Sequence, residues 1–139
     1  VFAGVQLTEG EEEKHRLIET LREHSYPVVD MSDNEMAKLH VRYMVGGHAS
    51  GIHDELLYRF QFPERPGALL KFLTGMAHGW NISLFHYRNH GSDYGRVLVG
   101  IQVPAAERPQ FNRFIHDLGY PYCEETDNPA YRLFLDGRN

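Results

Sequence analysis

Two stretches of the sequence follow one pattern, and this internal repeat limits the possible folds more than any other feature. The apolar segment VFAGVQL at Val1–Leu7 matches VLVGIQV at Val97–Val103, with glycine and glutamine at equivalent places. A run of apolar residues at helical spacing follows each segment: Leu17, Ile18 and Leu21 in the first copy, and Phe111, Phe114, Ile115 and Leu118 in the second. Each copy is therefore predicted to contain a strand followed by an amphipathic helix.

The similarity continues beyond the helices. Each helical run leads into a Tyr-Pro pair and a short predicted strand, at Tyr26–Val29 in the first copy and at Tyr120–Cys123 in the second. An acidic turn follows in both copies (DMSDNE and EETDNP), and a strand-like piece closes each of them (KLHVRYMVGG and AYRLFLDG). The two copies thus share one plan over their whole rear part.

Only the second copy has a front part. A strand (Leu56–Phe62), a Pro-Gly loop, a helix (Pro66–Ala77) and a strand (Ile82–Arg88) precede Val97. The complete copy therefore reads βαββαβ. Such a unit folds as a ferredoxin-like α+β sandwich of two layers, with both helices on one face of the sheet.

The repeat also predicts the domain organisation. Residues 1–45 are expected to be the rear half of a first subdomain, and residues 54–139 the complete second one. Residues 46–53, which include GGHASG, read as a flexible linker. Because the first copy has no front half and begins at Val1 instead of a methionine, we expect the chain to be a piece of something longer.

The composition suits a small globular domain. Of the 139 residues, 42% are hydrophobic and 24% are charged, which is enough for a packed core. The balance of 14 basic and 19 acidic residues, a net charge of −5, does not favour nucleic acid as a partner. The sequence has no apolar run near the ~20 residues of a membrane span, and no signal peptide. The single Cys123 fits a reducing cytoplasm, and its strand-like context predicts a small core residue.

The Pro-Gly loop raises the question of a bound ligand. In PERPGALLKFL, Pro66 suits the first turn of a helix, because its missing N–H costs nothing there. Gly67 lets the backbone approach a ligand closely, and the first N–H groups of the helix then form a site for a carboxylate or a phosphate. An ordinary strand-to-helix turn is the alternative.

The strand after this helix carries two polar side chains at its far end. NISLFHYRNHG at Asn81–Gly91 alternates as a half-buried strand should. The hydroxyl of Tyr87 and the guanidinium of Arg88 are suited to holding the polar end of an amino acid. The alternative is that Tyr87 packs at the sheet edge and that Arg88 is solvated.

The sequence contains no convincing catalytic or metal-binding set. Nine histidines are present, but His86 and His90 fall on a strand and its turn, and ligands at zinc spacing are missing. Ser92-Asp93 lies in a polar turn, and neither a G-x-S-x-G nor a P-loop motif occurs. We therefore predict no metal and no catalytic residue in this chain.

These motifs support a resemblance at two levels. Glu64-Arg65-Pro66-Gly67-Ala68-Leu69 resembles the D/E-x-P-G-x-L turn of ACT domains, small βαββαβ modules that sense amino acids. The strings DNEMAKLHVRYMVGG, FPERPGALLKFL, WNISLFHYRNHGSDYGRV and DNPAYRLF resemble the C-terminal regulatory region of biosynthetic threonine dehydratase, over nearly the whole chain. The resemblance implies a pair of ACT-like subdomains, one complete and one present as its rear half.

The resemblance implies a regulatory function. In that family the region is attached to a pyridoxal-phosphate catalytic domain, which converts threonine to 2-oxobutanoate and ammonia in isoleucine biosynthesis. Isoleucine inhibits the enzyme through this region, valine opposes the inhibition, and the enzyme is commonly a tetramer. We expect this chain to form a homo-oligomer, most simply a dimer. Lys14, Lys38 and Lys71 have no phosphate-cradling loop beside them, so we expect no cofactor in the chain itself.

The resemblance also implies which residues bind the effector. They lie in the Pro-Gly turn, on the helix after it and at the end of the next strand: Pro66, Gly67, Ala68, Leu69, Leu73, Met76, Tyr87 and Arg88. The apolar ones would form a wall for a branched side chain, while the helix N-terminus with Tyr87 or Arg88 would hold the charged end. The first copy lacks this turn and strand, so we expect no site there.

Two other functions remain open. The region could serve only assembly, with a vestigial pocket, and binding of isoleucine or valine would distinguish this from regulation. A small enzyme of the acylphosphatase kind would use Arg65 in the loop and Asn81 or Asn89 nearby, but the loop is too short to wrap a phosphate.

Overall fold

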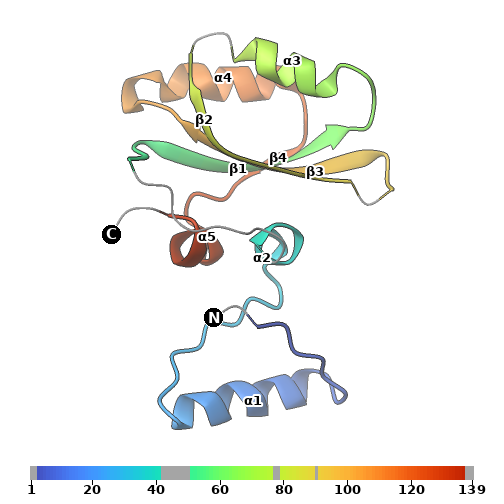
Figure 1. Cartoon of the computed structure of the whole chain (residues 1–139), viewed down its shortest axis with the longest axis vertical. Coiled ribbons are helices and arrows are strands. Elements are labelled where there is room, and N and C mark those ends of the chain that lie inside the picture. Colours follow the sequence, from blue (N-terminus) through green and yellow to red (C-terminus); the bar gives the residue numbers. More distant parts are fainter. Residues whose placement is uncertain (1–2, 42–50, 77–78, 90, 137–139) are drawn as a thin grey trace. The chain divides into compact units, whose positions relative to one another are not determined.

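The computed structural model describes residues 3–41, 51–76, 79–89 and 91–136. The chain forms two compact units, Val1–Asn34 and Glu35–Asn139 (Figure 1). The first unit thus ends before residue 45, where the sequence predicts the end of the first subdomain. Most of the predicted linker, residues 46–53, lies outside the described residues.

A four-stranded sheet organises the second unit. β1 (Glu55–Pro63), β2 (Asn81–Arg88), β3 (Tyr94–Gln102) and β4 (Tyr122–Glu124) lie in the order β2-β3-β1-β4, and neighbours run antiparallel. Helix α3 (Ala68–Gly75) connects β1 to β2. A short 3-10 turn (Ala105–Glu107) and helix α4 (Arg108–Leu118) connect β3 to β4. This order confirms the predicted βαββαβ unit and its α+β fold.

The main core lies between this sheet and the helices α3 and α4. Strand residues alternate between the two faces, so every second residue of β1 and β3 points into this core. These residues are Leu56, Tyr58, Phe60, Phe62, Val97, Val99 and Ile101, and Val103 directly after β3 joins them. Phe72 of α3 and Phe111 of α4 close the core, with ring centroids 5.2 Å from Phe62 and 5.1 Å from Trp80 respectively. Each buried aromatic ring contributes about 1.5–3 kcal/mol, so the core fixes α3 firmly over the sheet.

A second helical layer lies on the opposite face of the sheet. Helices α2 (Glu35–Leu39) and α5 (Pro129–Phe134) occupy this side, away from α3 and α4 (Figure 1). A smaller set of buried residues belongs to these helices, to the turn after α2 and to the second face of β1 and β3: Met36, Ala37, His40, Val41, Leu57, Leu98, Ala130 and Tyr131. The second unit therefore adds a pair of short helices on the far face of the predicted sandwich of sheet and two helices.

Helix α5 occurs where the sequence predicts the strand-like segment AYRLFLDG, whereas α2 overlaps only the start of KLHVRYMVGG, at Lys38 and Leu39. The rest of that segment, from residue 42 on, lies outside the described residues. Helix α5 starts as helices commonly do, with Pro129 at its first position and with the side chain of Asn128 accepting a hydrogen bond of 2.8 Å from the Ala130 amide. An Asp-Asn pair precedes α2 as well. The two copies of the repeat therefore still match after the Asp-Asn pair, because each continues as a short helix. Where the structure describes these segments, the predicted strands are wrong.

The first unit contains one helix and no sheet among its described residues. Helix α1 (Glu11–Glu23) confirms the predicted helical run. The strands expected at Val1–Leu7 and Tyr26–Val29 are not formed where the structure describes them. A strand needs a neighbour to satisfy its backbone hydrogen bonds, and no such neighbour lies beside either segment within the described part of this unit. Its apolar side chains are therefore at most half-buried.

Candidate functional site

The Pro-Gly loop adopts the conformation that its glycine permits. Gly67 has φ 86°, in the left-handed region, and open space lies where a side chain would project. It precedes α3 directly, and no side chain caps the N-terminus of this helix. Glu64 ties the loop to the turn between β2 and β3, because its amide donates to the Asp93 carbonyl at 2.8 Å. The exposed Pro66 lies in the turn itself, since α3 begins only at Ala68.

Helix α3 divides the predicted effector residues between two faces. Ala68 and Met76 are each 7% exposed and belong to the main core with Phe72. Leu69 and Leu73 are one helical turn apart and remain 44% and 43% exposed. The predicted apolar wall is therefore formed by the two leucines, while Ala68 and Met76 support the helix from beneath.

The exposed leucines lie on the flank of α3 that faces away from α4. The opposite flank carries Lys71, whose ammonium group donates to the Leu118 carbonyl at 3.1 Å. Gly75 lies on that flank too, where the ring of Phe114 occupies the space that a side chain would need. Because residues three and four apart share a helix face, Leu69 and Leu73 are left on the side away from this contact.

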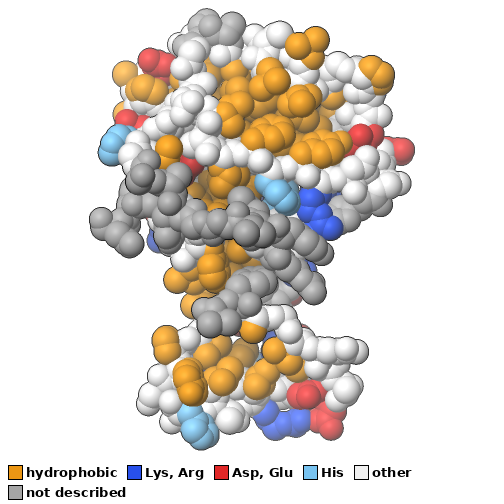
Figure 2. All heavy atoms as spheres, in the orientation of Figure 1, with side chains coloured by type: hydrophobic (Ala, Val, Ile, Leu, Met, Phe, Trp, Pro, Cys, Tyr) orange, Lys and Arg blue, Asp and Glu red, His pale blue; other side chains and the backbone are white. Residues whose placement is uncertain are grey.

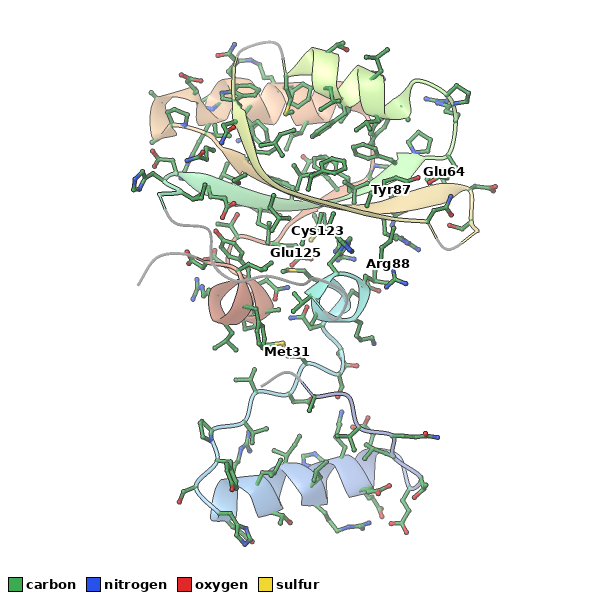
Figure 3. All side chains as sticks on the ribbon, viewed as in Figure 1. Met31, Glu64, Tyr87, Arg88, Cys123 and Glu125 are labelled. Carbon is green, nitrogen blue, oxygen red and sulfur yellow. The ribbon has the colours of Figure 1, made fainter. Side chains whose placement is uncertain are left out.

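Tyr87 lies on the face of the sheet that carries α3. It pairs with Val97 of the main core in the antiparallel register, and paired residues point to the same face. Its hydroxyl donates a hydrogen bond to the Glu64 carboxylate (Figure 3). The ring and the carboxylate fill the space beside Gly95, where a side chain would collide with both. Tyr87 therefore joins strand β2 to the Pro-Gly loop.

Arg88 points to the opposite face of the sheet from Tyr87. It is paired with Arg96, and its guanidinium donates to the Leu39 carbonyl of α2 at 3.4 Å (Figure 3). Neighbouring residues of a strand always project to opposite faces. The structure thus brings Gly67, Leu69, Leu73 and Tyr87 to the α3 side and separates Arg88 from them.

These groups form one surface, which we call the α3–β2 surface: Glu64, Gly67, Leu69, Leu73, Phe85 and Tyr87. Hydrophobic side chains gather over this part of the second unit (Figure 2), and Phe85 and Tyr87 remain 39% and 44% exposed. A carboxylate and a helix N-terminus adjoin the apolar side chains at the Pro-Gly loop. Such a surface suits a small molecule with one apolar part and two opposite charges. Glu64 opens the motif that resembles the ACT turn, but it is not among the predicted effector residues.

Two histidines meet on the other side of the sheet, where the sequence predicts no contact. His40 follows α2 and is fully buried, and its Nδ1 lies 2.8 Å from Nδ1 of His86 on β2. Burial, with the nearby positive charges of His86, Arg59 and Arg88, lowers the pKa of His40 to about 3. Burial and Arg88 also lower the pKa of His86. Both rings are therefore neutral near pH 7. Within the described ranges, no group of three or more metal-ligating side chains occurs.

A polar cleft of about 710 Å³ opens at the other end of β1 from the Pro-Gly loop. Its lining combines carboxylates with two arginines, and includes Asp54, Glu55, Arg108, Glu124, Asp127 and Arg132. Several of these groups already have partners, since Arg132 pairs with Asp127 and the Tyr131 hydroxyl donates to Glu55. Apolar side chains such as Ile52 and Leu56 are in the minority among the lining residues.

Cys123 lies exposed on the short edge strand β4. The prediction that it is a small core residue is therefore wrong. Its strand has only three residues, and all of them are exposed, so the strand-like context was no evidence for burial.

Every helix in the described ranges is too short or too polar to traverse a lipid bilayer.

Comparisons with known proteins point to one family. A family model described as the C-terminal regulatory domain of threonine dehydratase matches residues 46–135. The chain is 54% identical over 137 residues to L-threonine dehydratase biosynthetic IlvA of Escherichia coli (strain K12), which is 99% of this chain and 26% of that protein. It is 53% identical over 135 residues to the protein of the same name from Burkholderia multivorans, which is 97% of this chain and 26% of that protein.

A eukaryotic relative gives the same picture. The mitochondrial threonine dehydratase of Saccharomyces cerevisiae is 48% identical over 135 residues, which is 97% of this chain and 23% of that protein. The chain thus spans about a quarter of the length of the curated relatives it matches.

Proposed function

The chain belongs to the family of C-terminal regulatory domains of threonine dehydratase, and we propose that it binds isoleucine and valine as effectors at the α3–β2 surface. The two amino acids follow from the family resemblance, in which isoleucine inhibits and valine opposes the inhibition. One observation supports the location best. An apolar flank, a carboxylate and a helix N-terminus without a side-chain cap meet at the Pro-Gly loop.

The chemistry of an amino acid matches this arrangement group by group. The branched side chain would cover Leu69 and Leu73, which are more than two-fifths exposed and lose contact with water on binding. The carboxylate would accept hydrogen bonds from the first amides of α3 beside Gly67. The ammonium group would meet the Glu64 carboxylate, now held by Tyr87. Tyr87 is therefore placed to respond to the ligand.

The longer protein would be a pyridoxal-phosphate threonine dehydratase that forms 2-oxobutanoate and ammonia, with this chain as its regulatory part. Its cofactor would supply the chemistry of threonine conversion in a catalytic domain, which is then a partner of this chain within one polypeptide. A homo-oligomer, tetrameric in the parent enzyme, belongs to the same proposal. We keep the cytoplasm as the proposed compartment, although the yeast relative carries a mitochondrial name.

Calorimetric titration of the 139-residue chain with L-isoleucine and L-valine tests the proposal. We expect saturable binding, and we expect D-isoleucine to bind more weakly because its ammonium and side chain exchange places. Leu73→Ser should weaken isoleucine binding by about tenfold or more through the lost apolar contact. Leu70→Ser is the matched control, because Leu70 lies on the outer side of the same helix and is 64% exposed.

Two results would reject the proposal. Equal losses in the Leu73 and Leu70 variants would place the ligand elsewhere. The absence of any isoleucine or valine binding would favour a purely structural module with a vestigial pocket.

A further inference from the structure

Strand β2 faces two different parts of the second unit. Tyr87 points toward the Pro-Gly loop and α3, whereas His86 and Arg88 on either side of it point toward α2. The strand lies at the edge of the sheet, so among the described strands it is β3 alone that holds it through backbone hydrogen bonds. A small displacement of β2 at Tyr87 therefore also displaces the two side chains that contact α2.

Helix α2 is held to the sheet at both of its ends. At its start, Glu35 accepts a hydrogen bond of 2.5 Å from the Arg59 guanidinium on β1, and Arg59 also donates to the buried Glu125 at 2.9 Å. At its end, the Leu39 carbonyl accepts from Arg88, and the next residue, His40, meets His86. Of the three contacts that join α2 and His40 to the sheet, two depend on the position of β2.

The histidine contact is sensitive to geometry. The two rings meet edge to face, with centroids 5.0 Å apart and planes 81° apart, so one Nδ1 donates its hydrogen to the other. Among the described residues no partner is present for the buried Nε2 of His40. An apolar side chain would fill this place without that cost. The polar pair instead makes the docking of α2 depend on where β2 puts His86.

We propose that α2 is the output element of the effector site, and that strand β2 passes ligand occupancy at Tyr87 through the sheet to α2. This inference rests on the proposed function. Its physical content is a coupling: a ligand that fixes Tyr87 also fixes His86 and Arg88, and thereby strengthens the docking of α2. Because α2 follows Asn34 directly in the chain, a change in its docking acts on the segment before it. By linkage, looser docking of α2 must weaken ligand binding in turn.

Hydrogen exchange of the full chain with and without saturating L-isoleucine tests the coupling. We expect the amides of Glu35–Val41 to exchange at least about fivefold more slowly in the bound state, at the lower end of ordinary coupling factors. His40→Leu fills the buried position with an apolar side chain and removes the hydrogen bond with His86. In this variant the slowing should disappear, and isoleucine should bind more weakly by the same factor.

Tyr131→Phe is the matched control, since it removes a hydroxyl from α5 on the same face of the sheet. Its partner Glu55 meets β2 at Ser83, away from His86 and Arg88. The control should retain the slowing at Glu35–Val41. Isoleucine binding that leaves these amides unchanged in the unaltered chain would overturn the inference and leave the proposed function standing. Equal loss of slowing in His40→Leu and Tyr131→Phe would also overturn it. Absence of isoleucine binding to the unaltered chain would overturn both.

Discussion

Helices α1 and α4 occupy equivalent places in the two copies of the repeat, yet only α4 buries its apolar face. Phe111, Ile115 and Leu118 of α4 are at most 5% exposed, whereas no residue of α1 is buried. The sequence pattern of the two helices is the same kind, with apolar residues at helical spacing. The difference is that α4 lies against a sheet that includes β1 and beside α3, and α1 has neither within the first unit. Periodicity predicts a helix, but burial needs the layer that faces it.

The first prediction compares one apolar residue in each helix. Phe111→Ala should lower the free energy of unfolding by about 3–5 kcal/mol, because it leaves a cavity among Tyr58 and Trp80. Leu17→Ala in α1, where the side chain is half-buried, should cost distinctly less, about 1 kcal/mol. Urea unfolding followed by circular dichroism measures both. Comparable losses would mean that α1 is packed as tightly as α4, which would remove the contrast between the copies.

The complete unit was predictable because its local signals agree with each other. Alternation marked β2, helical spacing marked α4, and the Pro-Gly turn separated β1 from α3. The far face was less predictable, since α2 and α5 are short and their signal lies in the preceding Asp-Asn pair. The prediction treated that pair as part of an acidic turn instead of a helix start.

The candidate site divides in the same way. The loop and the leucines of α3 were selected from sequence, and Glu64 was missed because its role appears only when Tyr87 is seen beside it. The opposite directions of Tyr87 and Arg88 follow from strand geometry alone, so their separation was predictable from the sequence. The contact between His40 and His86 was not predictable from the sequence, because it joins residues that are far apart in the chain.

The second prediction uses the buried His40. Among the described residues of the first unit no side chain is buried, so no equivalent group is present there. Below pH 6.5, the ordinary pKa, the unfolded chain binds a proton at His40 that the folded chain does not bind until the pH nears 3. Stability from this group is therefore complete above pH 6.5 and is lost as the pH falls, by about 1.4 kcal/mol per unit. Between pH 6.5 and 4 the loss amounts to about 3 kcal/mol.

The measurement is urea unfolding between pH 7.5 and 4 for the unaltered chain and His40→Leu. Carboxylates that titrate in the same range contribute to both profiles, so the difference between the two slopes isolates His40. The variant should lose less stability on acidification. Parallel profiles would show that the ring takes up its proton equally in the folded and unfolded states.

The third prediction concerns the uncovered face of the first unit. Ile18 and Leu21 of α1 are half-buried and carry no covering layer in the described residues of that unit. We expect the chain to associate at micromolar concentration, most simply as a two-fold dimer, with each side chain contributing about 1.5 kcal/mol. Ile18→Glu with Leu21→Glu should return it to the monomer in sedimentation experiments, while Thr20→Glu on the exposed side should not.

One result would contradict this view of the first unit. A strictly monomeric chain whose amides in Val1–Met31 are strongly protected from exchange would show that the segment closes on its own chain. Helices α1 and α4 would then differ only in which part of the chain covers them, and both apolar faces would be covered within a single molecule.

The smallest expected effect tests whether the rear parts of the two copies both end in a helix. Asn128→Ala removes the side-chain oxygen that accepts from the Ala130 amide, and also the amide group that donates to Glu125 at 2.7 Å. The loss of an N-cap costs about 1 kcal/mol of stability. Asn128→Ser keeps a capping oxygen and should recover most of this loss in the same urea titration, whereas Asn128→Ala should also speed exchange in Pro129–Phe134. If alanine and serine cost the same, the cap contributes nothing, and α5 is held only by the burial of Ala130 and Tyr131 against the sheet. In that case the Asp-Asn signal shared by the two copies would not be what starts α5.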